Sequence, residues 1–146
     1  MIVDKEVLEK LDNIIDIIPN IIDPIDQVVR RYEPYTLEYY SGTAYQIYDA
    51  YLYLKDSLCK YFKRIIKLKD IIQNNSLHGT IENEIFFERR LNDIYIILSG
   101  ISLKKLADPT SYDLNFYGQE ESDTKKLTRA LNIIETITWT MSDDDE

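Results

Sequence analysis

The feature of this sequence that most constrains its fold is an unbroken apolar rhythm between residues 43 and 74. Apolar side chains recur at alternating spacings of four and three residues, which places them on one face of a helix. The positions are Ile47, Tyr51, Leu54, Leu58, Tyr61, Ile65, Leu68 and Ile72. Thr43-Ala44-Tyr45-Gln46 has the form of a capping box at the helix start. The pattern predicts one helix of about 48 Å over 43–74.

A second stripe with the same rhythm follows a turn-like segment, Asn75-Ser76-Leu77-His78-Gly79. Its apolar positions are Phe87, Leu91, Ile94, Leu98 and Ile101. Two long stripes joined by a short turn are typical of an antiparallel pair of helices. We therefore expect residues 43–74 and 80–106 to form a helical hairpin that makes the core.

Shorter helices are expected on both sides of this hairpin. A helix over 4–18 should end at Pro19, which lacks an amide hydrogen, and a second should start at Asp23-Pro24 and stop before Pro34. Residues 34–42 are either a linker or a short extra helix. Ser122 is a plausible N-cap for a last helix that packs through Leu127, Leu131 and Ile134. The sequence predicts an all-α antiparallel bundle of four to five helices, essentially without strands.

Length and composition indicate a single domain in a reducing compartment. The chain has 146 residues, 45% of them hydrophobic, and one cysteine, which excludes an intramolecular disulfide framework. No run approaches the ~18 apolar residues that span a bilayer, and the N-terminus does not resemble a secretory signal. We expect a helical domain over 1–141, a frayed acidic tail over 142–146, and a cytoplasmic location.

The net charge of −9 is unevenly distributed along the chain. Residues 43–74 hold six bases and three acids, whereas residues 107–146 hold ten acids and three bases. A chain this acidic is poorly suited to binding nucleic acid over its whole surface. It is better suited to a basic partner, or simply to remaining in solution.

Residues with catalytic or metal-binding chemistry are not arranged for it. His78 is the only histidine and Cys59 is expected several helical turns away, so neither a zinc site nor a nucleophile pair is expected. The segment 113–118 resembles the start of a calcium loop, but Thr124 stands where a bidentate glutamate is needed. No glycine-rich phosphate loop is present. We expect no catalytic residue, no metal, no cofactor and no enzymatic activity.

Carboxylates on the second stripe have an ordinary explanation. Glu84 and Glu88 lie one turn apart, and Arg89 and Arg90 are adjacent to them. A di-iron bundle would need Glu-x-x-His motifs on two helices, and the sequence has none. We interpret these carboxylates as members of surface ion pairs.

Two surface features remain as candidate sites. Tyrosine is enriched at interfaces because it combines an apolar ring with a polar tip, and the candidate partner surface is Tyr35, Tyr39, Tyr40 and Tyr53. The second feature is a basic strip within residues 55–69, whose candidate anion-binding members are Lys60, Lys63, Arg64 and Lys67. The alternative for the tyrosines is that they belong to the core. The alternative for the lysines is that they are solvated or paired with the acidic first helix.

These patterns favour a non-enzymatic protein that binds a protein partner, as an adaptor or inhibitor does; a basic or nucleic-acid-associated partner would suit its charge. The alternative function is a helical nucleic-acid-binding module that uses the strip at 55–69. High isoleucine and tyrosine content is typical of AT-rich genomes, such as those of viruses and mobile elements.

A homodimer is also expected from the surface of the longest helix. A second apolar stripe lies beside the first, and the two short N-terminal helices would leave part of it uncovered. Its members are Tyr45, Tyr48, Leu52, Cys59, Phe62 and Ile66.

Overall fold

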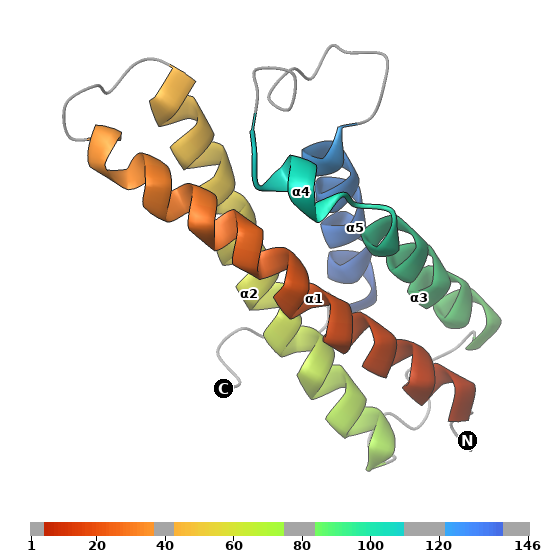
Figure 1. Cartoon of the computed structure of the whole chain (residues 1–146). Coiled ribbons are helices and arrows are strands. Elements are labelled where there is room, and N and C mark those ends of the chain that lie inside the picture. Colours follow the sequence, from red (N-terminus) through yellow and green to blue (C-terminus); the bar gives the residue numbers. More distant parts are fainter. Residues whose placement is uncertain (1–4, 37–42, 75–83, 110–121, 139–146) are drawn as a thin grey trace.

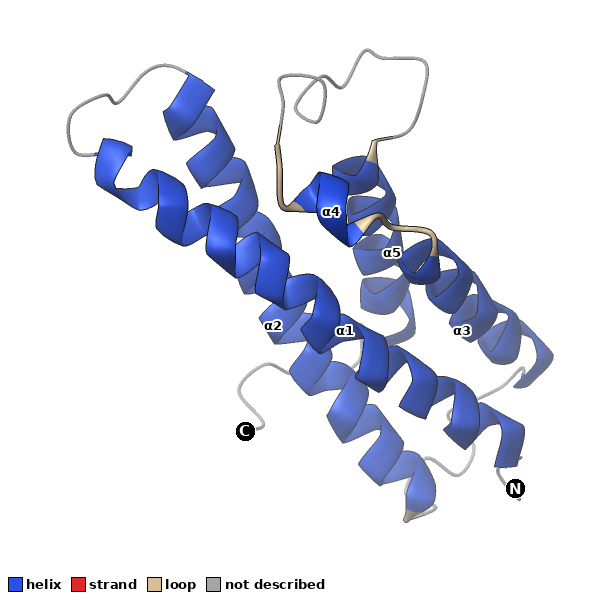
Figure 2. Ribbon diagram, in the orientation of Figure 1, coloured by secondary structure: helices blue, strands red, loops and turns tan. Residues whose placement is uncertain are grey.

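The computed structural model of the chain describes residues 5–36, 43–74, 84–109 and 122–138. In these ranges the secondary structure is helical and contains no strand, which confirms the all-α class (Figure 2). The elements are α1 (Lys5–Tyr32), a 3-10 turn (Glu33–Thr36), α2 (Thr43–Gln73), α3 (Glu84–Ser99), α4 (Leu103–Leu106) and α5 (Asp123–Thr138). None of these helices combines the length and apolarity that crossing a bilayer demands.

Helix α1 is continuous through both of its prolines, so the expected break between residues 18 and 24 is wrong. Pro19 is exposed on the outer side, whereas Pro24 is buried. The buried stripe keeps its four-three spacing across them: Val7, Leu11, Ile14, Ile18, Ile21, Ile25 and Val28. A proline inside a helix costs about 3 kcal/mol. Burying a side chain of this size contributes about 1.5–3 kcal/mol, so the seven positions together outweigh both prolines.

Helix α2 follows the sequence prediction closely. All eight positions of its predicted stripe are buried, with at most 9% of any residue exposed. The long hairpin at the centre of the bundle is confirmed, but the partner of α2 in it is α1 rather than residues 80–106 (Figure 1). The reason is the continuity of α1, whose 28 residues cover most of the 31-residue length of α2.

The four long helices form a bundle in which α2 and α3 occupy diagonal corners. Going round the bundle, α2 packs against α1, α1 against α3, α3 against α5, and α5 against α2. Helix α3 runs parallel to α1 and antiparallel to α5 (Figure 1). The ten residues 74–83 can span at most about 33–36 Å, which is ample for a diagonal crossing between helices spaced 8–10 Å apart.

The short helix α4 and its C-cap residue are hydrogen-bonded to both α1 and α2. The buried Tyr51 hydroxyl of α2 donates a hydrogen bond of 2.9 Å to the Leu106 carbonyl. The Arg31 guanidinium of α1 donates one of 3.3 Å to the Ala107 carbonyl. Since the buried Leu106 carbonyl would be costly to leave unpaired, the Tyr51 bond fixes α4 against α2, and the exposed Arg31 bond adds a contact with α1.

Two hydrogen bonds hold the start of α5, one within its first turn and one from the start of α4. The Ser122 hydroxyl oxygen accepts a hydrogen bond from the Lys125 amide, which confirms Ser122 as the N-cap. The Asp123 carboxylate, which is buried, accepts one of 3.1 Å from the Ser102 amide at the start of α4. The C-terminal end of α3 and the N-terminal end of α5 are therefore linked next to α4.

Ion pairs reinforce the contacts that α1 makes with its two neighbours. Lys55 of α2 lies 2.7 Å from Asp26 of α1, and Lys69 of α2 pairs with Asp12. Lys10 of α1 pairs with Glu88 of α3. The hydrogen bond from Lys55, together with Arg30, holds the pKa of Asp26 below its usual range although partial burial opposes this.

The Asp26 pair gives the protein an expected pH dependence. A carboxyl group whose pKa is lower in the folded state stabilises the fold above its unfolded pKa of about 4, and this stability is lost as the pH falls. Asp26→Asn is expected to lower the free energy of unfolding by about 0.5–1 kcal/mol at pH 7, because the pair is partly solvated. The difference should be smaller near pH 3, because Asp26 becomes partly protonated as the pH falls toward its lowered pKa.

Urea unfolding at the two pH values measures this difference. Asp16→Asn, which removes the same charge from the exposed side of α1, is the matched control. An Asp26→Asn effect that persists undiminished at low pH would contradict the assignment to the carboxylate charge.

Candidate protein-binding groove

The predicted tyrosine surface is only partly within the described chain. Tyr53 of α2 is 68% exposed, as expected for a position off the buried stripe. Tyr39, Tyr40 and the side chain of Tyr35 lie outside what the structure describes. Tyr53 is therefore the one member of this predicted surface that the structure places in solvent.

The predicted basic strip divides into two groups with different surroundings. Lys55 and Lys69 pair with carboxylates of α1, which matches the alternative in which the strip neutralises the acidic first helix. Lys60 and Lys63 are exposed, whereas Arg64 and Lys67 are half-buried.

Lys60 and Arg64 also pack on an aromatic ring of their own helix. The Lys60 ammonium and the Arg64 guanidinium lie 5.5 and 5.3 Å from the centre of the Tyr61 ring, within cation–π range. Burial, and the Glu135 carboxylate of α5, raise the pKa of Tyr61. These contacts account for part of the basic strip as packing between α2 and α5.

The remaining chemistry-bearing residues do not form a site in the described part of the chain. His78 and the segment 113–118 lie outside it, and Cys59 is a half-buried free thiol on α2. Glu88 forms a part-buried ion pair with Lys10 of α1, whereas the sequence suggested the adjacent Arg89 and Arg90 as its partners. Within the described residues no group of three His, Cys, Asp or Glu side chains is placed to hold a metal ion.

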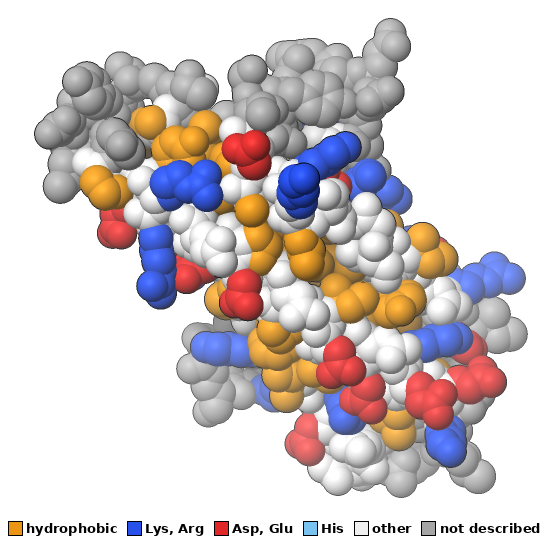
Figure 3. All heavy atoms as spheres, in the orientation of Figure 1, with side chains coloured by type: hydrophobic (Ala, Val, Ile, Leu, Met, Phe, Trp, Pro, Cys, Tyr) orange, Lys and Arg blue, Asp and Glu red, His pale blue; other side chains and the backbone are white. Residues whose placement is uncertain are grey.

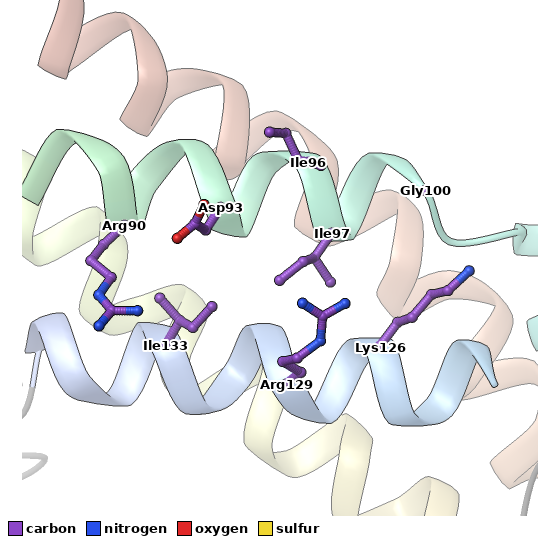
Figure 4. Close-up of a pocket in the computed structure, with 8 residues that line it drawn as sticks. All are labelled: Arg90, Asp93, Ile96, Ile97, Gly100, Lys126, Arg129 and Ile133. Atoms are coloured by element: carbon purple, nitrogen blue, oxygen red, sulfur yellow. The ribbon is translucent and has the colours of Figure 1, made fainter. Parts of the chain in front are cut away.

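An open groove lies between α3 and α5, on the outside of the bundle. Its volume is about 580 Å³, and Figure 4 shows the two antiparallel helices that form its walls. The lining residues are Arg90, Asp93, Ile96, Ile97 and Gly100 from α3 and its end, and Lys126, Arg129 and Ile133 from α5.

The floor and one lip of the groove are apolar. Ile97 is 7% exposed and Ile133 is half-buried against the core, so these two side chains form the floor. Ile96 stands on the lip and is 67% exposed; Tyr95, which does not line the groove, is 40% exposed. Large apolar side chains this exposed beside a groove are typical of a binding surface.

The charged lining of the groove is mainly cationic. Lys126 lies near the end where α3 stops, Arg129 lies in the middle beside Ile97, and Arg90 and Asp93 lie at the other end (Figure 4). Lys126 is 4.0 Å from the Asp123 carboxylate. Three cations and one carboxylate give the lining a charge of +2, within a chain whose net charge is −9.

The groove was not predicted from the sequence, although one signal for it was present. Residues 94–98 are five consecutive apolar residues, and in a helix such a run covers every side. One face is buried in the core, so the others must point outward at Tyr95 and Ile96. Which helix would lie beside them depended on the diagonal crossing, for which the sequence carried no signal.

Comparison with protein-family models, with curated proteins and with solved structures finds no match for this chain.

Proposed function

We propose that this protein is a non-enzymatic binding module, of the adaptor or inhibitor type, that takes a segment of a partner protein into the groove between α3 and α5. The observation that carries the proposal is the 67% exposure of Ile96 beside an apolar floor. The core is already filled without this side chain, so packing of the monomer does not explain it. Covering it with a partner would remove apolar surface from water.

The dimensions of the groove suit a short helix. From Arg90 to Gly100 the α3 wall extends about 15 Å, at 1.5 Å per residue. That length matches about three turns of a partner helix laid along it. Recognition would then follow the helix-in-groove mode, with one or two large apolar side chains as anchors.

Selection from a displayed library of random 15-residue peptides tests this function on the full chain. Ile96→Asp is expected to weaken the selected peptides about ten- to hundredfold, since burial of one isoleucine contributes about 1.5–3 kcal/mol. Tyr53→Asp is the matched control, because Tyr53 is equally exposed but lies on α2. Its affinities should equal those of the unmodified protein.

Two results would contradict the proposal. If the unmodified protein retains no peptide above background, the groove is not a peptide-binding site. If Tyr53→Asp abolishes binding and Ile96→Asp does not, the partner surface is the predicted tyrosine surface instead.

A second candidate function is the predicted binding of nucleic acid, which the exposure of Lys60 and Lys63 supports. Tyr53 lies seven residues before Lys60 on the same helix and is available for base stacking. Such binding should fall steeply with salt, and Lys63→Glu with Lys67→Glu should abolish it. Fluorescence anisotropy with single- and double-stranded DNA and RNA at ~50 mM salt would detect it, and a flat signal removes this candidate.

The structure removes part of the reason for expecting a homodimer. It assumed that short N-terminal helices leave part of α2 uncovered, but α1 is continuous along it. Tyr48, Leu52 and Phe62 of the second stripe are half-buried and pack against the core, and Ile66 is 43% exposed. A dimer would now have to form around Ile66 or around the groove itself.

A further inference from the structure

We propose that the segment bound in the α3–α5 groove is acidic as well as apolar: an amphipathic helix whose carboxylates face Lys126 and Arg129 while its apolar side chains cover Ile96 and Ile97. This inference rests on the proposed function and adds the chemistry of the partner. It differs from the basic partner that the net charge alone suggested.

The local charge of the groove is opposite to that of the whole protein. Two of the three basic residues of α5, Lys126 and Arg129, line it. Of the carboxylates of α5, Glu135 interacts with Tyr61 of α2, while Asp123 accepts the Ser102 amide and lies 4.0 Å from Lys126. Asp93 is the single carboxylate among the described lining residues. An acidic segment thus finds attraction in the groove and repulsion over much of the remaining surface.

The end of the bundle next to Lys126 is basic as well. Helix α4 carries Lys104 and Lys105, both exposed, and it lies where α3 ends and α5 begins. On the face shown in Figure 3, basic side chains gather over α4, while acidic ones gather over the N-terminal half of α1. An incoming acidic segment is therefore steered toward the α4 end of the groove.

The cations lie close enough to the apolar floor for one bound segment to contact both. The Arg129 guanidinium lies between the two helices, beside Ile97 (Figure 4). A guanidinium can bind a carboxylate through two parallel hydrogen bonds, and such charge-assisted bonds are stronger than neutral ones. A partner that covers Ile96 and Ile97 would also exclude water around this pair, which strengthens the attraction.

The opposite end of the groove sets the direction of the bound helix. Arg90 and Asp93 both line that end, so its cation is accompanied by a carboxylate. A partner carboxylate there would face Asp93 as well as Arg90. The acidic residues of the segment should consequently cluster at the end that lies against Lys126 and Arg129.

The peptides selected from the library supply the probe for this inference. The pool is expected to contain more aspartate and glutamate than the starting library. The most enriched peptide is then synthesised in two forms, as selected and with its acids replaced by lysine. Affinity for the full chain is measured by fluorescence anisotropy at low and high salt.

Reversal of the groove charge should reverse the preference between the two peptides. Lys126→Glu with Arg129→Glu is expected to weaken the acidic peptide about tenfold or more, and to strengthen the lysine form. Arg129→Glu alone leaves the Lys126–Asp123 pair in place and should weaken binding of the acidic peptide by a smaller factor. Lys5→Glu, at an exposed position at the start of α1, makes the same change of net charge as Arg129→Glu alone and should leave the affinity unchanged.

The results separate this inference from the proposed function. A pool without excess acid, or an affinity within twofold of the original after groove reversal, overturns the acidic partner and leaves peptide binding intact. A loss from Lys5→Glu equal to the loss from Arg129→Glu also overturns it, because net charge would then be the cause. An empty pool overturns the proposed function itself.

Discussion

Replacing Leu58 by aspartate is expected to leave the protein unfolded at room temperature. Leu58 is 0% exposed and lies midway along the buried stripe of α2. The change removes a buried leucine, worth about 1.5–3 kcal/mol, and places a carboxylate among apolar side chains at a cost of several kcal/mol more. The total approaches the 5–15 kcal/mol that stabilises a typical domain.

Far-ultraviolet circular dichroism and a thermal melt measure this effect directly. Tyr53→Asp introduces the same residue into the same helix at a 68% exposed position, and it should melt within a few degrees of the unmodified protein. A Leu58→Asp protein with native helicity and an unchanged melting temperature would show that this stripe is not the core.

Replacing Pro19 by alanine is expected to stabilise the protein by about 2–2.5 kcal/mol. Pro19 lies inside α1, where proline is about 3 kcal/mol less favourable than alanine because it leaves a carbonyl one turn earlier without its helical donor. The gain is partly offset, since alanine makes the unfolded chain more flexible by about 0.4–1 kcal/mol. The ring is exposed, so little packing is lost.

Pro24→Ala provides the comparison within the same helix. Its ring is buried, so the alanine variant loses apolar contacts that offset the restored hydrogen bond. We expect chemical denaturation to rank Pro19→Ala above Pro24→Ala in stability. A loss of stability in Pro19→Ala would mean that the proline shapes α1 to fit α2.

The helices with a regular apolar spacing could be predicted from the sequence, because burying one face of a helix requires apolar residues at that spacing. The eight positions of the α2 stripe and the five that begin at Phe87 are all buried. The Ser122 cap was also predictable, because a hydroxyl before a helix start satisfies a local amide. Each of these features depends on residues within one turn or one helix.

The features that could not be predicted depend on contacts between distant segments. The rule that proline ends a helix is local, and at Pro19 and Pro24 it was outweighed by a partner helix 31 residues long. The expectation that neighbouring helices pair failed for α2 and α3, since the residues between them allow a diagonal crossing. The groove follows from that crossing, so only the run of apolar residues that contains Ile96 was visible in the sequence.

The diagonal position of α3 also fixes the order in which the structure can be assembled during synthesis. Helices α1 and α2 are complete by residue 73, but the contacts that cover their remaining faces come much later, as with Lys10 and Glu88, 78 residues apart. At 5–20 residues per second, the chain needs roughly 3–13 s to reach residue 138. During that interval a half-bundle with exposed apolar side chains must avoid aggregation. The groove exists only once α5 has docked, so an immature chain lacks the proposed binding site.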